Sequence, residues 1–278
     1  MMRLAAVVII YNPDLNELAD NLESYRQCVG QLIVWDNTPG GTPSLERLTE
    51  PNDVLVMGTG ENLLIAKPLN KVLEWCACNG YTHLLTLDQD SRFANRLTNL
   101  VPIVEKLIDS NPRSAIFGVN PNHLVPADCE PFLYPDVITS GSVYDVQKIL
   151  EINGFREDFG IDAVDIEICY RAKEQGYNTY IIPEIELQQQ YGNLTKTRWG
   201  FHTLNYSAFR CYHITRNFVI MWKEYPRLFA QKDFFVHTFL IRGIPKIILG
   251  EQNKWKKLKA IILGFYDGLR KKTPQRSL

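Results

Sequence analysis

Short apolar runs with strand character recur in the first ninety residues and alternate with segments of helical spacing. The runs are residues 4–10, 31–35, 54–57 and 83–87. Apolar residues three and four apart predict helices over Leu15 to Val29 and over Pro68 to Cys78. Strand, helix and strand joined by short links pair in parallel through right-handed crossovers. The alternation predicts an open, mostly parallel α/β sheet flanked by helices, with ligands beyond the carboxyl ends of its strands.

The first apolar run, Leu4 to Tyr11, is as long as the core of a signal peptide, but no small-residue cleavage site follows it. Asn12-Pro13 instead indicates the end of a buried strand, so we expect no export signal here. The 6 cysteines lack metal-ligand spacing and predict free thiols in a reducing cytosol. A chain of 278 residues that is 45% hydrophobic can build one large core or two small ones.

Two aspartates one residue apart close the fourth strand run. In an extended backbone, residues i and i+2 point to the same side, so Asp88 and Asp90 can present both carboxylates together. Such a pair can hold Mg²⁺ or Mn²⁺, which proteins bind through one or two carboxylates together with the phosphates of a substrate. The spacing alone also fits a solvated turn or a helix cap.

Seven motifs resemble those of family 2 inverting glycosyltransferases. The first four lie in the predicted sheet: Tyr11-Asn12, Asp36-Asn37, the segment 62–70 and the segment 87–91. The later three resemble the acceptor half of that family: residues 138–142, 154–159 and 162–171. The resemblance spans about residues 4–220. The forms Asp-Gln-Asp-Ser and Val-Asp-Ile-Glu are most similar to bacterial rhamnosyltransferases that use dTDP-rhamnose in the synthesis of surface polysaccharides such as O-antigen or capsule.

The resemblance implies a GT-A-like glycosyltransferase fold over residues 1–220. Within it, residues 1–95 would bind the nucleotide sugar and residues 96–220 the acceptor, with a helical extension over 221–278. The implied reaction moves L-rhamnose from dTDP-rhamnose onto a lipid-linked saccharide, with Mg²⁺ or Mn²⁺ as cofactor. A UDP-linked donor carrying galactofuranose, galactose or glucose is the alternative within the family.

The resemblance assigns six residues to the donor nucleotide: Tyr11, Asn12, Asp36, Asn62, Lys67 and Asp88. Asp36 would accept the imide N–H of uracil or thymine, and Tyr11 would offer a flat face to the base. Core packing is the other interpretation of Tyr11, and simple solvation that of Lys67. The chain departs from the family at Leu64, where a glycine is usual, and at Pro68, where an alanine is usual.

Inversion at the anomeric carbon needs a base that removes the proton of the acceptor hydroxyl. Counting back from Arg171, Asp165 stands where the family places its catalytic aspartate, and it falls in the first turns of a predicted helix. The helix dipole would favour its ionised form. Asp162 is a candidate for the acceptor or diphosphate, although a helix N-cap is the simpler role. Glu167 is expected to pair with a cation. Ser140 and Gly141 would let an acceptor approach the backbone, or form a plain turn.

The sequence offers two candidates for a third metal ligand, Gln189 and His202. The family often has a histidine before a glycine at this point, and Gln189 stands at the matching spacing here. An amide oxygen suits Mg²⁺ better than a transition metal. His202 is an alternative ligand. Arg210 and Arg216 resemble family arginines that would contact the diphosphate or a phosphate on the acceptor, because a guanidinium matches phosphate oxygens; solvated helix faces are the other interpretation.

The C-terminal forty residues combine aromatic and basic side chains in two predicted amphipathic helices, 234–249 and 255–269. Residues 242–276 hold ten basic residues against Glu251 and Asp267. No apolar run reaches the ~18 residues that a membrane span needs. The pattern predicts a segment that lies on an anionic membrane surface, with a helical cap or a homodimer contact as alternatives. The lipid-linked acceptor that the resemblance implies would place the protein in the cytoplasm, peripheral on the inner face of the cytoplasmic membrane.

Three other classes of protein fit the sequence less well. A nucleotidyltransferase usually has a glycine-rich basic loop after its first strand, and residues 12–16 contain no glycine and no basic residue. A non-catalytic sugar-nucleotide-binding protein would lack the acceptor-side base, which Asp165 supplies. No motif that reads nucleic acid accompanies the basic tail, so no nucleic-acid partner is expected.

Overall fold

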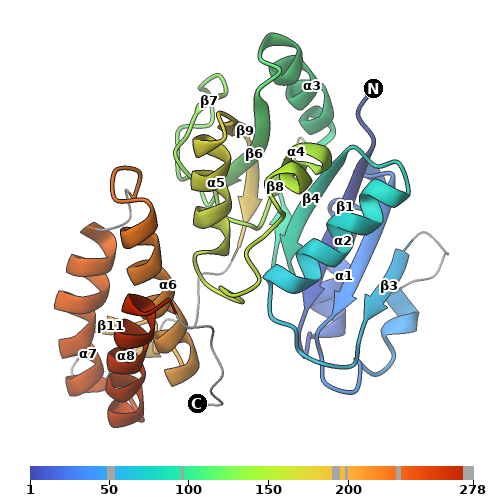
Figure 1. Ribbon diagram of the computed structural model, residues 1–278. Coiled ribbons are helices and arrows are strands. Elements are labelled where there is room, and N and C mark those ends of the chain that lie inside the picture. The colour runs from blue at the N-terminus through green and yellow to red at the C-terminus, as the bar shows by residue number, and fades with distance from the viewer. Residues whose placement is uncertain (49–53, 95–96, 190–194, 198–199, 230–232, 272–278) are drawn as a thin grey trace. The chain divides into compact units, whose positions relative to one another are not determined.

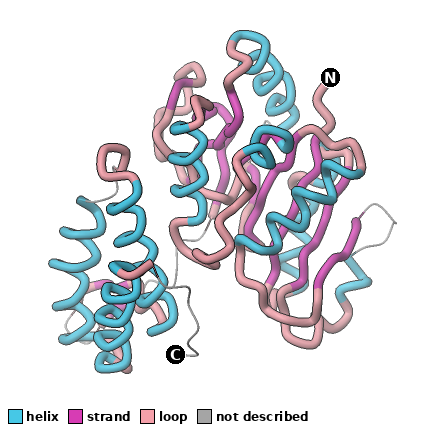
Figure 2. The backbone as a smooth tube through the Cα atoms, in the orientation of Figure 1, coloured by secondary structure: helices cyan, strands magenta, loops and turns pink. Residues whose placement is uncertain are grey.

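The computed structural model describes residues 1–48, 54–94, 97–189, 195–197, 200–229 and 233–271 (Figures 1 and 2). It divides into two compact units. The first consists of Met1–Gly160 and Val164–Gln190, and the second of Ile161–Ala163 and Tyr191–Leu278. The basic residues Lys272 and Arg276 of the predicted tail lie outside the described residues.

Four parallel strands form one half of the sheet in the first unit. Their order is β3 (Val54–Gly58), β2 (Gln31–Asp36), β1 (Leu4–Ile10), β4 (His83–Asp88). The helices α1 (Leu15–Glu23) and α2 (Ala66–Cys78) stand between successive strands, as the spacing predicts. Asp14 begins α1, because its carboxylate accepts the N–H groups of Asn16 and Glu17. This half confirms the predicted α/β alternation.

The other half of the sheet is mixed. In the described part of the chain the sheet has nine strands, and beyond β4 the order continues as β8 (Ser142–Asp145), β6 (Ser114–Pro121), β9 (Asn178–Gln188) and β5 (Arg92–Phe93), with β7 (Phe132–Leu133) also on β9. β8 runs antiparallel to both β4 and β6, while β6 and β9 are parallel. The prediction of a mostly parallel sheet therefore holds only for the first ninety residues. The chain enters β8 from the loop after β6, without the helical crossover that parallel pairing requires.

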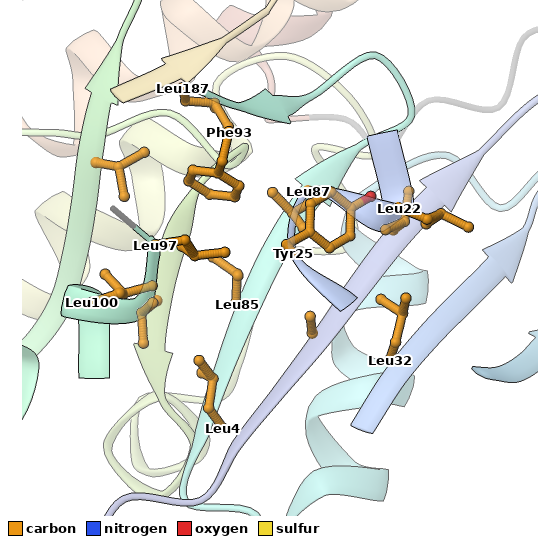
Figure 3. Close-up of a cluster of buried hydrophobic side chains, with 14 of the residues drawn as sticks. Leu4, Leu22, Tyr25, Leu32, Leu85, Leu87, Phe93, Leu97, Leu100 and Leu187 are labelled. Atoms are coloured by element: carbon orange, nitrogen blue, oxygen red, sulfur yellow. The ribbon is translucent and has the colours of Figure 1, made fainter. Parts of the chain in front are cut away.

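Helices cover both faces of the sheet. Alternate residues of β1, among them Leu4 and Val8, face one cluster of buried side chains together with Leu22 of α1 and Leu100 of α3 (Leu100–Ser110) (Figure 3). α2 contacts β1 and β4 without contributing to that cluster, so it covers the opposite face. The remaining helices of this unit are η1 (Arg26–Cys28), η2 (Leu45–Leu48), η3 (Leu97–Asn99), α4 (Val146–Glu151) and α5 (Val164–Glu174).

The second unit is mainly helical. It contains the short hairpin β10 (Thr195–Lys196) and β11 (His202–Thr203), the helix α6 (Ala208–Glu224), the π-helical segment η4 (Phe234–Gly243), and the helices α7 (Ile244–Gly250) and α8 (Lys254–Leu269). None of the described helices is both long and apolar enough to cross a membrane.

Two glycines bring α6 and α8 into close contact. A Cβ at Gly264 would lie 2.5 Å from the carbonyl oxygen of Tyr212, and one at Gly268 would lie 2.8 Å from that of Arg216. Both glycines are buried. Because α6 packs on α8, the compact unit joins residues on both sides of position 220. The functional division at 220 that the sequence suggests stays a prediction.

Candidate active site

Polar residues follow the parallel strands at one edge of the sheet. The register pairs Ile10 of β1 with Asp36 of β2, and Ile9 of β1 with Asp88 of β4, so the three strands end side by side. Tyr11 and Asn12 directly follow β1. The carboxyl ends of these strands are where an open α/β sheet binds its ligands. Tyr11, Asn12, Asp36 and Asp88, which are predicted to bind the donor, therefore lie at the same edge of the sheet.

Tyr11 and Asn12 are exposed, which excludes the core-packing interpretation of Tyr11. The backbone N–H of Tyr11 donates to Oε1 of Gln89 at 2.8 Å. Asn12 has a left-handed backbone, with φ of 45°, and its N–H donates to the hydroxyl of Thr38 at 2.9 Å. These bonds join the loops after β1, β2 and β4, and leave the ring of Tyr11 at the surface.

Asp36 is buried and holds its own loop. Its Oδ1 accepts the N–H of Thr38 at 2.8 Å, and its Oδ2 accepts the N–H of Thr42 at 2.6 Å. The hydroxyl of Thr42 donates to the same carboxylate at 3.0 Å. The observed role of Asp36 is thus to close the loop 36–42, and its predicted contact with a nucleobase stays a prediction.

Asn37 fixes the loop that leads into α2, a role that the sequence analysis missed. Its Oδ1 accepts the N–H of Leu63 at 3.1 Å, and its Nδ2 donates to the carbonyl of Leu64 at 2.5 Å. Asn62 is exposed and accepts the N–H of Leu64 at 2.9 Å. Leu64 has φ of 61°, so it keeps the backbone shape that a glycine would adopt more easily. Lys67 lies exposed in the first turn of α2.

Ser140 and Gly141 are buried, and their expected contact with an acceptor stays a prediction. The hydroxyl of Ser140 accepts the N–H of Asp88 at 3.3 Å and also contacts the hydroxyl of Ser91. Gly141 has φ of 80°, and a Cβ there would lie 2.4 Å from Cγ2 of Val119. Ser140 therefore supports the turn that carries Asp88, and Gly141 packs against Val119 and Leu187.

Gln189 reaches Asp88 from the end of β9. Its Nε2 donates to Oδ2 of Asp88 at 2.7 Å, whereas its Oε1 is buried without a hydrogen-bond partner. Asp90 stands two residues after Asp88, and the side chains of Asp88, Asp90 and Gln189 all carry oxygen atoms, which Mg²⁺ and Mn²⁺ prefer as ligands. The metal role expected for Asp88 and Asp90 stays a prediction. Among the described residues no group of three or more His, Cys, Asp or Glu side chains offers a metal site. His202 is exposed on β11 in the second unit.

Asp165 lies in the first turn of α5, as predicted, and it is partly buried. Burial raises the pKa of its carboxyl group from 3.8 to about 6, and the nearby Asp136 adds to the rise. The N–H groups of Ile166 and Thr139 lower the pKa in part. Burial therefore outweighs the helix dipole expected to favour the ionised form, and the pKa is raised rather than lowered. A carboxyl group that titrates near 6 is well matched to a general base at neutral pH.

The segment after β7 links Asp165 to Asp88. Thr139 approaches Asp165 through its backbone N–H, and the next residue, Ser140, bonds the turn of Asp88. Thr86, at the end of β4, accepts the N–H of Gly141 at 2.8 Å through its carbonyl. The carboxylate of Asp165 and the backbone of Asp88, which are far apart in the sequence, are thus contacted by adjacent residues of one segment.

Glu167 confirms its predicted pairing with a cation. Its carboxylate receives two hydrogen bonds from Arg171, at 3.0 Å and 2.8 Å, and its side chain is 1% exposed. Arg171 also donates to the carbonyl of Gly154 at 2.7 Å. This ion pair anchors α5 to the preceding loop and keeps the first turn of the helix in place.

Asp162 and Arg210 form an ion pair within the second unit. Nη2 of Arg210 lies 2.7 Å from Oδ1 of Asp162, and its guanidinium lies 4.6 Å from the ring centre of Tyr206. Because α5 begins at Val164, its N-cap position is Ala163, so the N-cap role expected for Asp162 is wrong. Burial raises the pKa of Asp162, and Arg210 partly offsets that rise.

Arg216 has no exposed surface. Its Nη1 donates to Oδ1 of Asn217 at 2.6 Å, and Asn217 in turn donates to the carbonyls of Ile161 and Asp162 at 2.9 Å. The guanidinium of Arg216 is enclosed by these partners, and its expected contact with a phosphate stays a prediction. Arg210, with 40% of its side chain exposed, remains a candidate.

The fold and the carboxylate-bearing strand ends define a class: this is the GT-A fold of glycosyltransferases. The structure is similar to GalNAc-T7 with UDP, GalNAc and Mn²⁺, at a TM-score of 0.63 and 12% identity over 97% of this chain. It is also similar to residues 1–349 of S. aureus TarS in complex with UDP-GlcNAc, at a TM-score of 0.59 and 15% identity, covering 98% of this chain and 82% of that one. This chain spans 56% of the GalNAc-T7 chain.

The similarity in sequence is more specific. The chain is 26% identical over 288 residues to the dTDP-rhamnosyl transferase RfbF of Shigella flexneri, and the match covers 95% of each protein. No protein-family model matches the chain. The resemblance to family 2 rhamnosyltransferases that the motifs indicate is confirmed by this relative and by the shared fold.

Proposed function

We propose that this protein is an inverting glycosyltransferase that moves L-rhamnose from dTDP-rhamnose onto a lipid-linked saccharide during synthesis of a surface polysaccharide. The observation that carries the proposal is the pair of adjacent contacts made by Thr139 and Ser140, which hold Asp165 and the turn of Asp88 on one segment. An inverting transferase needs one carboxylate on the acceptor side of the sugar and another on the diphosphate side.

The proposed chemistry assigns the base to Asp165. Its carboxylate takes the proton of an acceptor hydroxyl while that oxygen forms a bond to the anomeric carbon. The bond from the anomeric carbon to the diphosphate oxygen breaks on the opposite face, and its electron pair leaves with dTDP. The raised pKa supports this role. A carboxyl group with a pKa of about 6 is mostly ionised at neutral pH, and it holds a proton more strongly than an ordinary aspartate does.

The proposed cofactor is Mg²⁺ or Mn²⁺, held by Asp88, Asp90 and Gln189. Its support is the oxygen donor set and the unpartnered Oε1 of Gln189 beside Asp88. A divalent cation there would offset the charge of the departing diphosphate. Tyr11, Asn12, Asn62 and Lys67 are the exposed residues proposed for the nucleotide.

The acceptor and the location complete the proposal. The RfbF similarity supports a dTDP donor, and the UDP-sugars of the structural neighbours keep a uridine donor as the second candidate. We place the protein in the cytoplasm, at the inner face of the membrane, where a lipid-linked acceptor would be available. A homodimer is compatible with this location.

A panel of dTDP- and UDP-sugars, each with Mg²⁺, Mn²⁺ or a chelator, tests the donor and the cofactor. We expect calorimetry to show metal-dependent binding of dTDP-rhamnose and slow hydrolysis to rhamnose. Asp90→Asn should weaken metal-dependent binding of dTDP strongly while preserving the fold, with Asp109→Asn on the exposed face of α3 as the matched control. Tighter binding of a UDP-sugar would select the second candidate, and equal affinity in Asp90→Asn and wild type would refute the metal site.

A further inference from the structure

The outward face of α8 is apolar, which is unusual for a helix at the surface of a protein. Five large side chains are between 45% and 74% exposed: Trp255, Ile262, Phe265, Tyr266 and Leu269. At about 100° of rotation per residue, they fall within an arc of about 100° on the helix. A contiguous exposed apolar stripe of this kind marks an interaction surface.

The opposite face of α8 already has its partner. Gly264 and Gly268 lie against the backbone of α6. Lys257 and Asp267 are also buried on this side: Lys257 lies 2.6 Å from Glu251, and Asp267 accepts the hydroxyl of Tyr212 at 3.0 Å. The inward face is thus fully engaged within the second unit. The apolar stripe is the side of α8 that faces away from α6.

Cations border the stripe. Lys254, Lys256, Lys259 and Arg270 are exposed, and the guanidinium of Arg270 lies 3.8 Å from the ring centre of Tyr266. Asp267 is the one acidic residue of α8, and it is buried. The outward surface of α8 therefore carries apolar and positive groups without a compensating negative one. An anionic surface with an apolar layer beneath it complements these groups in both charge and polarity.

We infer that the outward face of α8 inserts into the surface of an anionic lipid bilayer. The helix lies parallel to the membrane plane. Ile262, Leu269 and Trp255 enter the boundary between headgroups and acyl chains, and the flanking lysines contact lipid phosphates. An amphipathic helix of this composition binds in that manner, with its apolar face about 5–10 Å deep. The inference rests on the proposed function in one respect: membrane binding would bring the enzyme to its lipid-linked acceptor.

Vesicle binding tests the inference without a sugar donor, so its failure is distinct from a failure of the proposed reaction. The full-length protein is titrated with vesicles of equimolar phosphatidylcholine and phosphatidylglycerol, and with phosphatidylcholine alone. We expect binding to the anionic vesicles that salt weakens. Lipids brominated in the acyl chain should quench tryptophan fluorescence in the wild type, and Trp255→Phe should remove that quenching.

Double variants measure separately how the apolar stripe and the flanking lysines of α8 contribute to vesicle binding. Ile262→Glu with Leu269→Glu should lower partitioning about 100-fold or more, whereas Leu124→Glu with Leu133→Glu, at similarly exposed leucines of the first unit, should change it less than about threefold. Lys256→Gln with Lys259→Gln should lower it about 10- to 30-fold. The control Lys106→Gln with Lys173→Gln removes two exposed lysines elsewhere.

Three results would overturn the inference. One is the absence of binding to anionic vesicles. Another is binding that the α8 variants leave unchanged. The third is a concentration-dependent dimer in analytical ultracentrifugation that Ile262→Glu with Leu269→Glu abolishes, because the occupant of the stripe would then be a second copy of the chain.

Discussion

The two compact units differ in what they expose. The first unit packs an apolar sheet between helices (Figure 3), and buried polar residues such as Asp36 and Glu167 hold its loops and helices. The second unit buries Lys257 and Arg216 beside apolar residues, and exposes Trp255 and Ile262 on α8. Exposed apolar side chains gathered on one face of a helix are typical of an interaction surface. We therefore propose that the sheet unit serves the donor and the helical unit an interface.

The largest expected effect is at Asp165, a partly buried carboxylate of the first unit with a raised pKa. Asp165→Asn should slow transfer by roughly 10²- to 10⁴-fold, because an amide cannot accept the proton of the acceptor hydroxyl. Affinity for dTDP should stay unchanged in calorimetry. Glu174→Gln, at an exposed carboxylate on the same helix, should retain the wild-type rate within about twofold. A mild effect of Asp165→Asn would place the base elsewhere.

The buried ion pair of the second unit should give the next largest effect. Lys257→Met leaves Glu251 buried without its cation, and we expect a loss of about 3–5 kcal/mol in the free energy of unfolding. Combining it with Glu251→Met should restore most of that loss. Lys148→Met in the first unit, where the pair with Asp145 is more exposed, should cost no more than about 1 kcal/mol. Equal losses at Lys257 and Lys148 in urea denaturation would remove the contrast between the units.

The contact between α6 and α8 predicts a smaller loss. Gly264→Ala places a methyl group 2.5 Å from the carbonyl oxygen of Tyr212, so the helices must separate, at a cost of about 1–3 kcal/mol. Phe265→Ala, at the neighbouring exposed position, should change stability by less than about 0.5 kcal/mol. The midpoints of thermal unfolding measure both variants. A larger loss at Phe265 than at Gly264 would mean that the stripe is part of the core.

The last expected effect, similar in size to that of Gly264→Ala, is a dependence of stability on pH. The pKa of Asp165 is raised to about 6 in the folded protein, above the 3.8 of an unperturbed aspartate. Its contribution to stability is therefore fully present below about pH 4 and is lost as the pH rises through 6. Asp165→Asn removes this dependence, so it should be more stable than the wild type at pH 8 by about 1 to 3 kcal/mol. Parallel stability profiles of the two proteins from pH 4 to 8 would contradict the raised pKa.

Local patterns predict the first half of the fold well. Apolar runs and helical spacing locate β1, β2, β3 and β4, because each element's signal lies within its own residues. The mixed half of the sheet is not predictable in this way. β8 has only four residues, and its antiparallel pairing depends on where a long loop leads the chain. The placement of Asp165 at the start of a helix was predicted, whereas its raised pKa depends on the surrounding fold.

Burial separates the predicted site residues that the structure leaves accessible from those that it encloses. Arg216 and Ser140 match family motifs, but their side chains are enclosed, and a motif carries no information on exposure. Asn37 is the opposite case: it stands in a quoted motif, and its bonds to Leu63 and Leu64 appear only once the loops are folded. The apolar exposure of Trp255 and Ile262 also needs the structure, because a helical pattern does not show which face is covered.

The bonds between Ser91 and Ser140, and between Thr86 and Gly141, join the two halves that the motifs divide at residue 95. A chimaera that takes its first 95 residues from one transferase and the rest from another would therefore inherit mismatched halves of one network. Exchange of donor specificity between relatives requires residues 86–91 and 139–142 to move together, as a single block. Chimaeras joined at residue 95 should therefore fold poorly, even when both parent enzymes are active, because they lose the bonds between residues 86–91 and 139–142.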